Sequence, residues 1–156
     1  MTAIAVRDTR ESDLPALFEI QTDADGQFMA AFTDTSNDRE KYLRKHRQLL
    51  ADDSVVEKVI VADGEVIGSI ASFVMEGDTE VTYWIRRDFW GRGIATKALA
   101  ALLEEVRVRP VFARAAADNA GSIRVLERNG FVRVGEEESF AEARQGEIRE
   151  IIFRLG

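Results

Sequence analysis

The sequence predicts an α/β protein of the α+β type, with a mixed, mostly antiparallel sheet flanked by about four helices. Stretches rich in Val and Ile alternate with stretches whose apolar residues recur at helical spacing. Three predicted strands also follow one another through tight turns, which is typical of an antiparallel meander. No repeat, linker or low-complexity segment interrupts the pattern, so we expect a single domain over residues 1–156.

The N-terminal part predicts one strand and two helices. The strand spans residues 4–7, and the first helix begins near Ser12, a typical N-cap residue. Residues 23–37 predict irregular structure, and the next helix is expected to begin at the capping pair Asn37 and Glu40. Each helix has an apolar stripe: Leu14, Leu17 and Phe18 in the first, and Tyr42, His46, Leu49 and Leu50 in the second.

The middle of the chain predicts the meander. Its strands span residues 55–62, 66–74 and 80–85, and the pair Asp63-Gly64 predicts a type I′ hairpin turn between the first two. The remaining elements are a helix that ends near Arg107, a strand at 111–117, a short helix at 122–129 closed by Gly130, and two strands near 131–137 and 147–154.

Composition excludes several classes of function. The chain has 46% hydrophobic and 31% charged residues and no cysteine, which excludes disulfides, thiolate catalysis and zinc sites built on sulfur. The net charge of −7 and the lack of a basic stripe speak against a nucleic-acid partner. No apolar run approaches the ~20 residues that span a bilayer, and the N-terminus lacks the pattern of a signal peptide. We therefore expect no membrane partner and, by default, a cytoplasmic protein.

Residues 86–97 stand out for their charge and their glycines. They hold four bases and one acid, with Gly91 and Gly93 where an extended pattern becomes helical. The first N–H groups of a helix lack intrahelical partners and its dipole favours an anion, so bare backbone there fits a phosphate. The P-loop pattern fails because no Lys-Ser/Thr pair follows Gly93, and the dinucleotide pattern fails because Thr96 stands at its third glycine.

The segment Trp90-Gly91-Arg92-Gly93-Ile94-Ala95 resembles motif A of the GCN5-related N-acetyltransferases, the GNAT superfamily, in its ribosomal-protein (RimJ/RimL-like) branch. That motif reads Q/R-x-x-G-x-G/A. Residues 118–131 are similar to the family's later pattern N-x-x-S-x-x-V-L-E-x-x-G-F, and Arg7 to Leu17 to its first strand and helix. The resemblance covers nearly the whole chain.

The resemblance implies a sheet that splays between its fourth and fifth strands, with acetyl-CoA in the gap as co-substrate and no metal. It implies that Tyr83, Trp84 and Ile85 offer a backbone edge to the pantetheine and that Asn119 bonds the same arm. The pyrophosphate would accept hydrogen bonds from the backbone N–H groups of Gly91, Arg92, Gly93, Ile94, Ala95 and Thr96. Trp90 departs from the Gln or Arg of the motif, so Arg92, Arg124 or Arg128 would have to supply a missing polar contact; otherwise Trp90 is a core residue and the later arginines are surface residues.

N-acetylation by direct attack needs a base for the ammonium and a proton donor for the leaving thiolate. The resemblance favours Glu80 as the base, with Asp78 as a weaker option, because Arg114 stands where some relatives have a second glutamate. Leu126 replaces the tyrosine acid of many relatives, which leaves Ser122 as the hydroxyl near the thiolate, unless Ser122 only caps its helix. His46 is interpreted as structural.

The acceptor is expected to be a primary amine, either a protein or peptide N-terminus or a small amine. The missing tyrosine and the uncertain base also favour an alternative, a non-catalytic acyl-CoA-binding regulatory module on the same fold. A homodimer is one option for the assembly.

Overall fold

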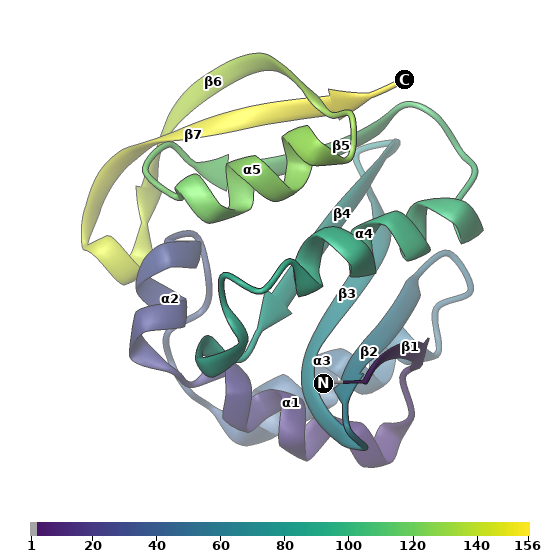
Figure 1. Ribbon diagram of the computed structural model, residues 1–156. Helices are drawn as coiled ribbons and strands as arrows, with labels where there is room; N and C mark the ends of the chain where they lie inside the picture. Colours follow the sequence, from purple (N-terminus) through teal and green to yellow (C-terminus); the bar gives the residue numbers. More distant parts are fainter. Residues whose placement is uncertain (1–2) are drawn as a thin grey trace.

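The computed structural model describes residues 3–156 and shows one seven-stranded sheet in the order β1-β2-β3-β4-β5-β7-β6 (Figure 1). The strands are β1 (Ile4–Asp8), β2 (Val56–Ala62), β3 (Glu65–Met75), β4 (Asp78–Ile85), β5 (Val111–Ala116), β6 (Val132–Ala141) and β7 (Gly146–Leu155). The helices are α1 (Leu14–Gln21), α2 (Ala24–Ala30), α3 (Arg39–Leu50), α4 (Ile94–Glu105) and α5 (Ala120–Arg128). Only β4 and β5 pair in parallel, so the expected mixed, mostly antiparallel sheet is confirmed.

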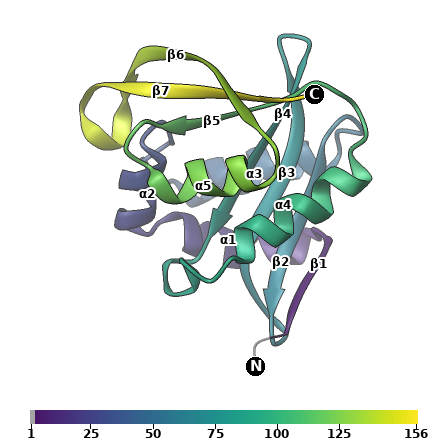
Figure 2. The ribbon, with the colours of Figure 1, turned by 45° about the horizontal axis from the view of Figure 1, so that its top comes forward.

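Helices cover both faces of the sheet, as Figure 2 shows. The larger core lies under α4 and α5, where Leu99, Leu102 and Leu126 pack on Ile70 and Phe153 of the sheet. A smaller core on the other face holds Leu14, Leu17, Ile20 and Val59, with Trp84 packed against it. Among residues 3–156, no helix has the length and apolar character that a membrane span requires.

Local signals decided the turns correctly. Asp63 and Gly64 both have positive φ, +49° and +85°, as the type I′ turn between β2 and β3 requires. At the end of α5, Gly130 (φ +87°) donates its N–H to the carbonyl of Glu127, and Phe131 donates to Leu126. These two bonds form a Schellman motif, so the predicted stop at Gly130 is confirmed.

Three local expectations were wrong. Residues 24–30 form α2 rather than irregular chain, because the Asp23 carboxylate accepts the Gly26 N–H at 2.9 Å and caps the helix. In the same way Asp38, and not Asn37, caps α3. Ser12 caps nothing and lies in a single 3₁₀ turn, Glu11–Asp13, that precedes α1. With α2 included, five α-helices flank the sheet.

The sheet opens between β4 and β5. These strands pair only at Thr79–Val111 and Glu80–Phe112, and from Val81 onward they diverge (Figure 1). On its other side β4 stays paired with β3 up to Ile85. The splay predicted between the fourth and fifth strands is thus confirmed, and Glu80 lies at its apex.

Candidate active site

The glycine turn before α4 forms a cradle of bare backbone. Gly91 and Gly93 have φ of +74° and +75°, in the left-handed region where side chains are strained, and Gly93 is the N-cap of α4. A Cβ built at either glycine meets no atom within 4 Å, so packing inside the chain does not explain the glycines. No side chain caps this 12-residue helix, which leaves the N–H groups of Ile94, Ala95 and Thr96 for another acceptor. The cradle therefore fits the pyrophosphate of acetyl-CoA, the group that the sequence analysis placed here.

The free edge of β4 faces the gap. The carbonyl oxygen of Trp84 points toward β3, because a Cβ at Gly68 would lie 2.2 Å from it, and the Arg86 N–H donates to Ile67 of β3 at 2.7 Å. Backbone groups of neighbouring residues in a strand alternate in direction, so those of Tyr83 and Ile85 turn toward the gap. Of the three residues expected at this edge, these two face the side where a pantetheine would lie.

Trp90 ties the glycine turn to β4. Its Nε1–H donates to the Ile85 carbonyl at 2.7 Å, and 42% of the residue is exposed. It is therefore not the core residue that was one interpretation of this departure from the motif. The bond fixes the entry of the cradle, since it joins the end of β4 to the residue that precedes Gly91.

The bases near the cradle have different partners. Arg86 binds Glu65 and Asp88, and Arg87 binds Asp25, so their charges are largely compensated. Arg92 lies 5.0 Å above the Phe89 ring and has no ion pair among residues 3–156. Arg92 is consequently the base beside the cradle that is best placed to meet an anion.

Tyr83 and Ser122 form a pair on the α5 side of β4, which the sequence analysis missed. The Tyr83 hydroxyl lies 2.5 Å from Ser122 Oγ and donates to the Ser122 carbonyl at 3.2 Å. Burial raises the pKa of Tyr83 to about 12, so the phenol stays protonated at neutral pH. The missed signal was the alternation of β4, which puts Tyr83 on the face opposite Glu80.

Asn119 caps α5, so the idea that Ser122 only caps this helix was wrong. Asn119 Oδ1 accepts the Ser122 N–H at 3.2 Å, while its Nδ2 donates to the carbonyl of Met29 in α2 at 3.3 Å. Ser122 is thereby held at the third position of the helix, with its hydroxyl on Tyr83. The bond of Asn119 to a pantetheine stays a prediction.

Glu80 is a half-buried carboxylate at the apex of the splay, with a side chain that is 14% exposed. Burial raises its pKa above the ordinary value, and the guanidinium of Arg114, 4.0 Å away, opposes this shift. Arg114 is itself held by Glu137 and Glu150. A carboxylate with a raised pKa is a stronger base than a solvated one, which suits proton abstraction. The role of Glu80 stays a prediction.

A groove of about 1280 Å³ runs along the same face of the sheet as Glu80, although Glu80 itself is not among the residues that line it. Thr82 and Trp84 line it from the sheet, and α3 and the loop between α2 and α3 form its other walls. Phe140, near the end of β6, and Glu142, in the connection from β6 to β7, complete it. His46 also lines this groove rather than the gap, and among residues 3–156 no three His, Asp or Glu side chains are placed to hold a metal ion.

Residues 4–132 match the family model of the acetyltransferase (GNAT) domain. The chain belongs to this family. Over 105 residues it is 32% identical to YdaF of Bacillus subtilis, described as a ribosomal N-acetyltransferase candidate, and the match spans 63% of this chain and 57% of that relative. The expected GNAT family is confirmed, and at the level of the family so are the acyltransferase class and acetyl-CoA as co-substrate. The likeness to YdaF supports the expected ribosomal-protein branch.

Solved structures of GNAT proteins share this fold over nearly the whole chain. The ribosomal-protein-alanine N-acetyltransferase of Brucella melitensis is 26% identical, with a TM-score of 0.77 over 97% of this chain and 98% of that one. YncA of Salmonella typhimurium, solved with acetyl-CoA, has a TM-score of 0.80 at 22% identity over 98% of this chain and 93% of its own. At that identity the second likeness shows the fold alone.

Proposed function

We propose that this GNAT protein transfers an acetyl group from acetyl-CoA to a primary amine, either a protein or peptide N-terminus or a small amine. One observation carries the proposal: a base and a proton donor lie on opposite faces of β4 beside its free edge. Glu80 lies on the groove face, and Tyr83 with Ser122 lies on the α5 face. An amine that enters from the groove would thus lose its proton on one face, while the thiolate leaves on the other.

The reaction needs two proton transfers and no covalent intermediate on the protein. Glu80 accepts a proton from the ammonium, directly or through a water, so that the amine lone pair can form the C–N bond as the C–S bond breaks. The thiolate then takes a proton or a hydrogen bond from Ser122. Tyr83 supports this step by holding Ser122 Oγ in position, 2.5 Å from its own hydroxyl, and either hydroxyl of the pair can be the donor.

An α-amine suits this site better than a lysine side chain. With a pKa of ~8, an α-amine is about a tenth neutral at pH 7, whereas a lysine amine with a pKa of ~10.4 is neutral under about 1% of the time. A site with one carboxylate as its base works best on the acceptor that already supplies more free amine. The Brucella protein is named a ribosomal-protein-alanine N-acetyltransferase, and this name also supports an α-amine as the acceptor.

A second candidate function is a non-catalytic acyl-CoA-binding module. Leu126 in place of a tyrosine favours it, since the side chain is wholly buried and supplies no proton. The Tyr83–Ser122 pair favours the enzyme instead, because Ser122 lies on the same helix as Leu126 and offers a hydroxyl as proton donor in place of the missing tyrosine.

A panel of amines separates the two functions. Acetyl-CoA is mixed with the protein and with alanine-amide, short peptides that begin with alanine or serine, N-acetyl-lysine-amide, or aliphatic amines. Thiol release and the intact mass of each amine are then measured. The enzyme is expected to acetylate at least one α-amine and to acetylate the lysine derivative more slowly. Acetyl-CoA binding without thiol release above the no-protein rate for any amine would instead support the module. The cytoplasmic location and the homodimer stay predictions.

A further inference from the structure

The groove contains a buried carboxylate that the proposed reaction does not use. Glu57 of β2 lines the groove about two strands away from β4, and its side chain is only 5% exposed. Its Oε1 lies 3.4 Å from Nδ1 of His46 on α3, and the His46 ring stacks on Tyr42 with 4.0 Å between centroids. The three side chains form one cluster at the end of the groove, away from the splay.

This cluster is short of hydrogen-bond donors. Glu57 Oε2 and His46 Nδ1 are both buried, and neither has a hydrogen-bond partner among residues 3–156. Buried carboxylates normally accept at least one hydrogen bond, because the loss of hydration is otherwise not compensated. A positively charged donor that enters from the groove would supply what Glu57 lacks.

The strand register gives the distance from Glu57 to β4. Glu57 pairs with Ala71 of β3, and Ala71 pairs with Thr82 of β4, so the three side chains share one face in a row. Two strand spacings separate the ends of this row, about 10 Å. Ala71, which lies between them, has a small side chain that does not obstruct the groove. Along β4, Thr82 lies between Glu80 and Trp84.

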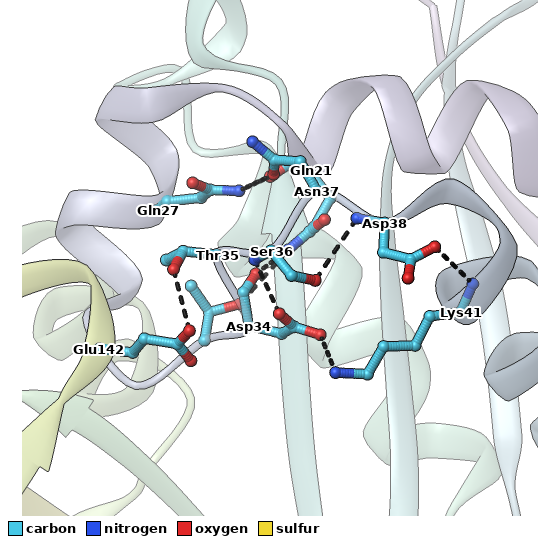
Figure 3. A network of polar contacts seen from close by, with 10 residues as sticks. Gln21, Gln27, Asp34, Thr35, Ser36, Asn37, Asp38, Lys41 and Glu142 are labelled. Atoms are coloured by element: carbon cyan, nitrogen blue, oxygen red, sulfur yellow. Dashed lines mark hydrogen bonds and ion pairs between the residues drawn. The ribbon is translucent and has the colours of Figure 1, made fainter.

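The walls of the groove have the matching charge. Its described lining residues include five carboxylates and two lysines, and one of these lysines, Lys41, binds Asp34 at 2.9 Å. Figure 3 shows the polar contacts around this ion pair, where Gln27 donates to Asn37 and Thr35 donates to Glu142. The Ser36 N–H and Lys41 hold the pKa of Asp34 at about 2, so its charge persists at neutral pH.

We propose that the groove receives an acceptor with a second positive charge and that Glu57 binds this charge, about 10 Å from β4, the strand beside which the amine is acetylated. The inference rests on the proposed function, because the first amine must lie at the splay. It narrows the acceptor to a molecule with two cationic groups, such as a peptide whose second residue is lysine or arginine, or a linear diamine of similar length.

The test compares acceptors that differ only in the second charge. The first pair is alanyl-lysine-amide and alanyl-norleucine-amide, and the second is diaminooctane and octylamine; thiol release gives kcat/KM for each. The wild-type protein is expected to prefer the dication by at least about tenfold in one pair, the strength of a charged hydrogen bond. The pair that shows the preference identifies a peptide or a small diamine as the source. Equal kcat/KM within both pairs overturns the proposal.

Two variants locate the charge. Glu57→Gln keeps the shape of the side chain and is expected to reduce the preference to less than about threefold, with no change for the monocation. Glu104→Gln, on the solvent side of α4, changes the net charge equally and is expected to keep the full preference. A preference that survives in Glu57→Gln overturns the assignment to Glu57.

Calorimetry with the same ligands and the CoA-saturated protein keeps the two proposals apart. If no acceptor is acetylated but the dication binds at least about tenfold more tightly than its partner in wild type only, the proposed function fails and the cation site stands. If neither turnover nor binding distinguishes the pairs, the cation site fails by itself.

Discussion

The two faces of the sheet beside β4 are built in different ways. On the α5 face, the cradle comes from the end of β4, the eight-residue connection 86–93 and the start of α4, a stretch close to a recognisable motif. On the groove face, contacts join distant segments. Thr35 binds Glu142 across 107 positions, and Arg144 binds the Phe28 carbonyl across 116. The co-substrate side thus depends on local backbone geometry, and the acceptor side on tertiary contacts between side chains.

The largest expected effect tests the backbone side. Gly93→Val should weaken acetyl-CoA binding at least about hundredfold, because a side chain would keep phosphate from two or more N–H groups. Gly64→Val is the matched control, since Gly64 also has positive φ and open space around a built Cβ, but lies in the β2–β3 turn. Calorimetry measures both. Equal affinities in the two variants would contradict the cradle.

Glu80→Gln should lower kcat/KM at least about tenfold at pH 7, with acetyl-CoA affinity unchanged, because the amide cannot accept a proton. Activity should partly recover toward pH 9 as free amine accumulates. In wild type, kcat/KM should fall as the pH drops through the raised pKa of Glu80, because protonation removes the base. The fall should therefore begin at a higher pH than for a solvated carboxyl group.

Asp78→Asn is the control for Glu80, because Asp78 lies two residues earlier on the same face of β4 and was the weaker candidate for the base. It should keep wild-type turnover and the same acid limb. If Asp78→Asn loses the fall of kcat/KM at low pH while Glu80→Gln keeps normal turnover, Asp78 and not Glu80 is the base.

The hydroxyl pair on the α5 face should behave as one unit. Tyr83→Phe and Ser122→Ala should each reduce kcat about three- to tenfold, and the double variant should be no slower than the slower single one. The KM for acetyl-CoA should not change. Rate losses that multiply in the double variant would show that the two hydroxyls act independently.

The smallest expected effect concerns the acceptor side. Arg144 binds Asp118 with two hydrogen bonds of 2.8 and 2.9 Å, donates to the Phe28 carbonyl and stacks 3.9 Å from its ring. Arg144→Lys should cost about 1 kcal/mol of unfolding free energy, since lysine cannot make this planar fork. Thermal or urea unfolding measures it.

Arg133→Lys is the control for Arg144, because its ion pair with Glu136 is exposed and should contribute little to stability. Hydrogen exchange should become faster in α2 for Arg144→Lys only. Equal stability in the two variants would show that α2 does not depend on this contact.

The sequence by itself determined the parts of the molecule that local rules specify. The meander, the type I′ turn at Asp63-Gly64, the stop at Gly130 and the glycine cradle follow from residues a few positions apart. The splay was also expected, because the motifs on either side of it resemble a family with that geometry. In each case the backbone conformation of a few residues carries the signal.

Only the tertiary structure decided the acceptor side and the proton donors. α2 has seven residues and weak periodicity, and the carbonyls at its C-terminal end and C-cap accept hydrogen bonds from Arg144, Asn119 and Ala143 of the other half of the chain. The approach of Tyr83 to Ser122, and of His46 to Glu57, joins segments that carry no signal of one another. Side-chain contacts of this kind depend on how strands and helices stack, and a single sequence specifies that stacking only through the complete fold.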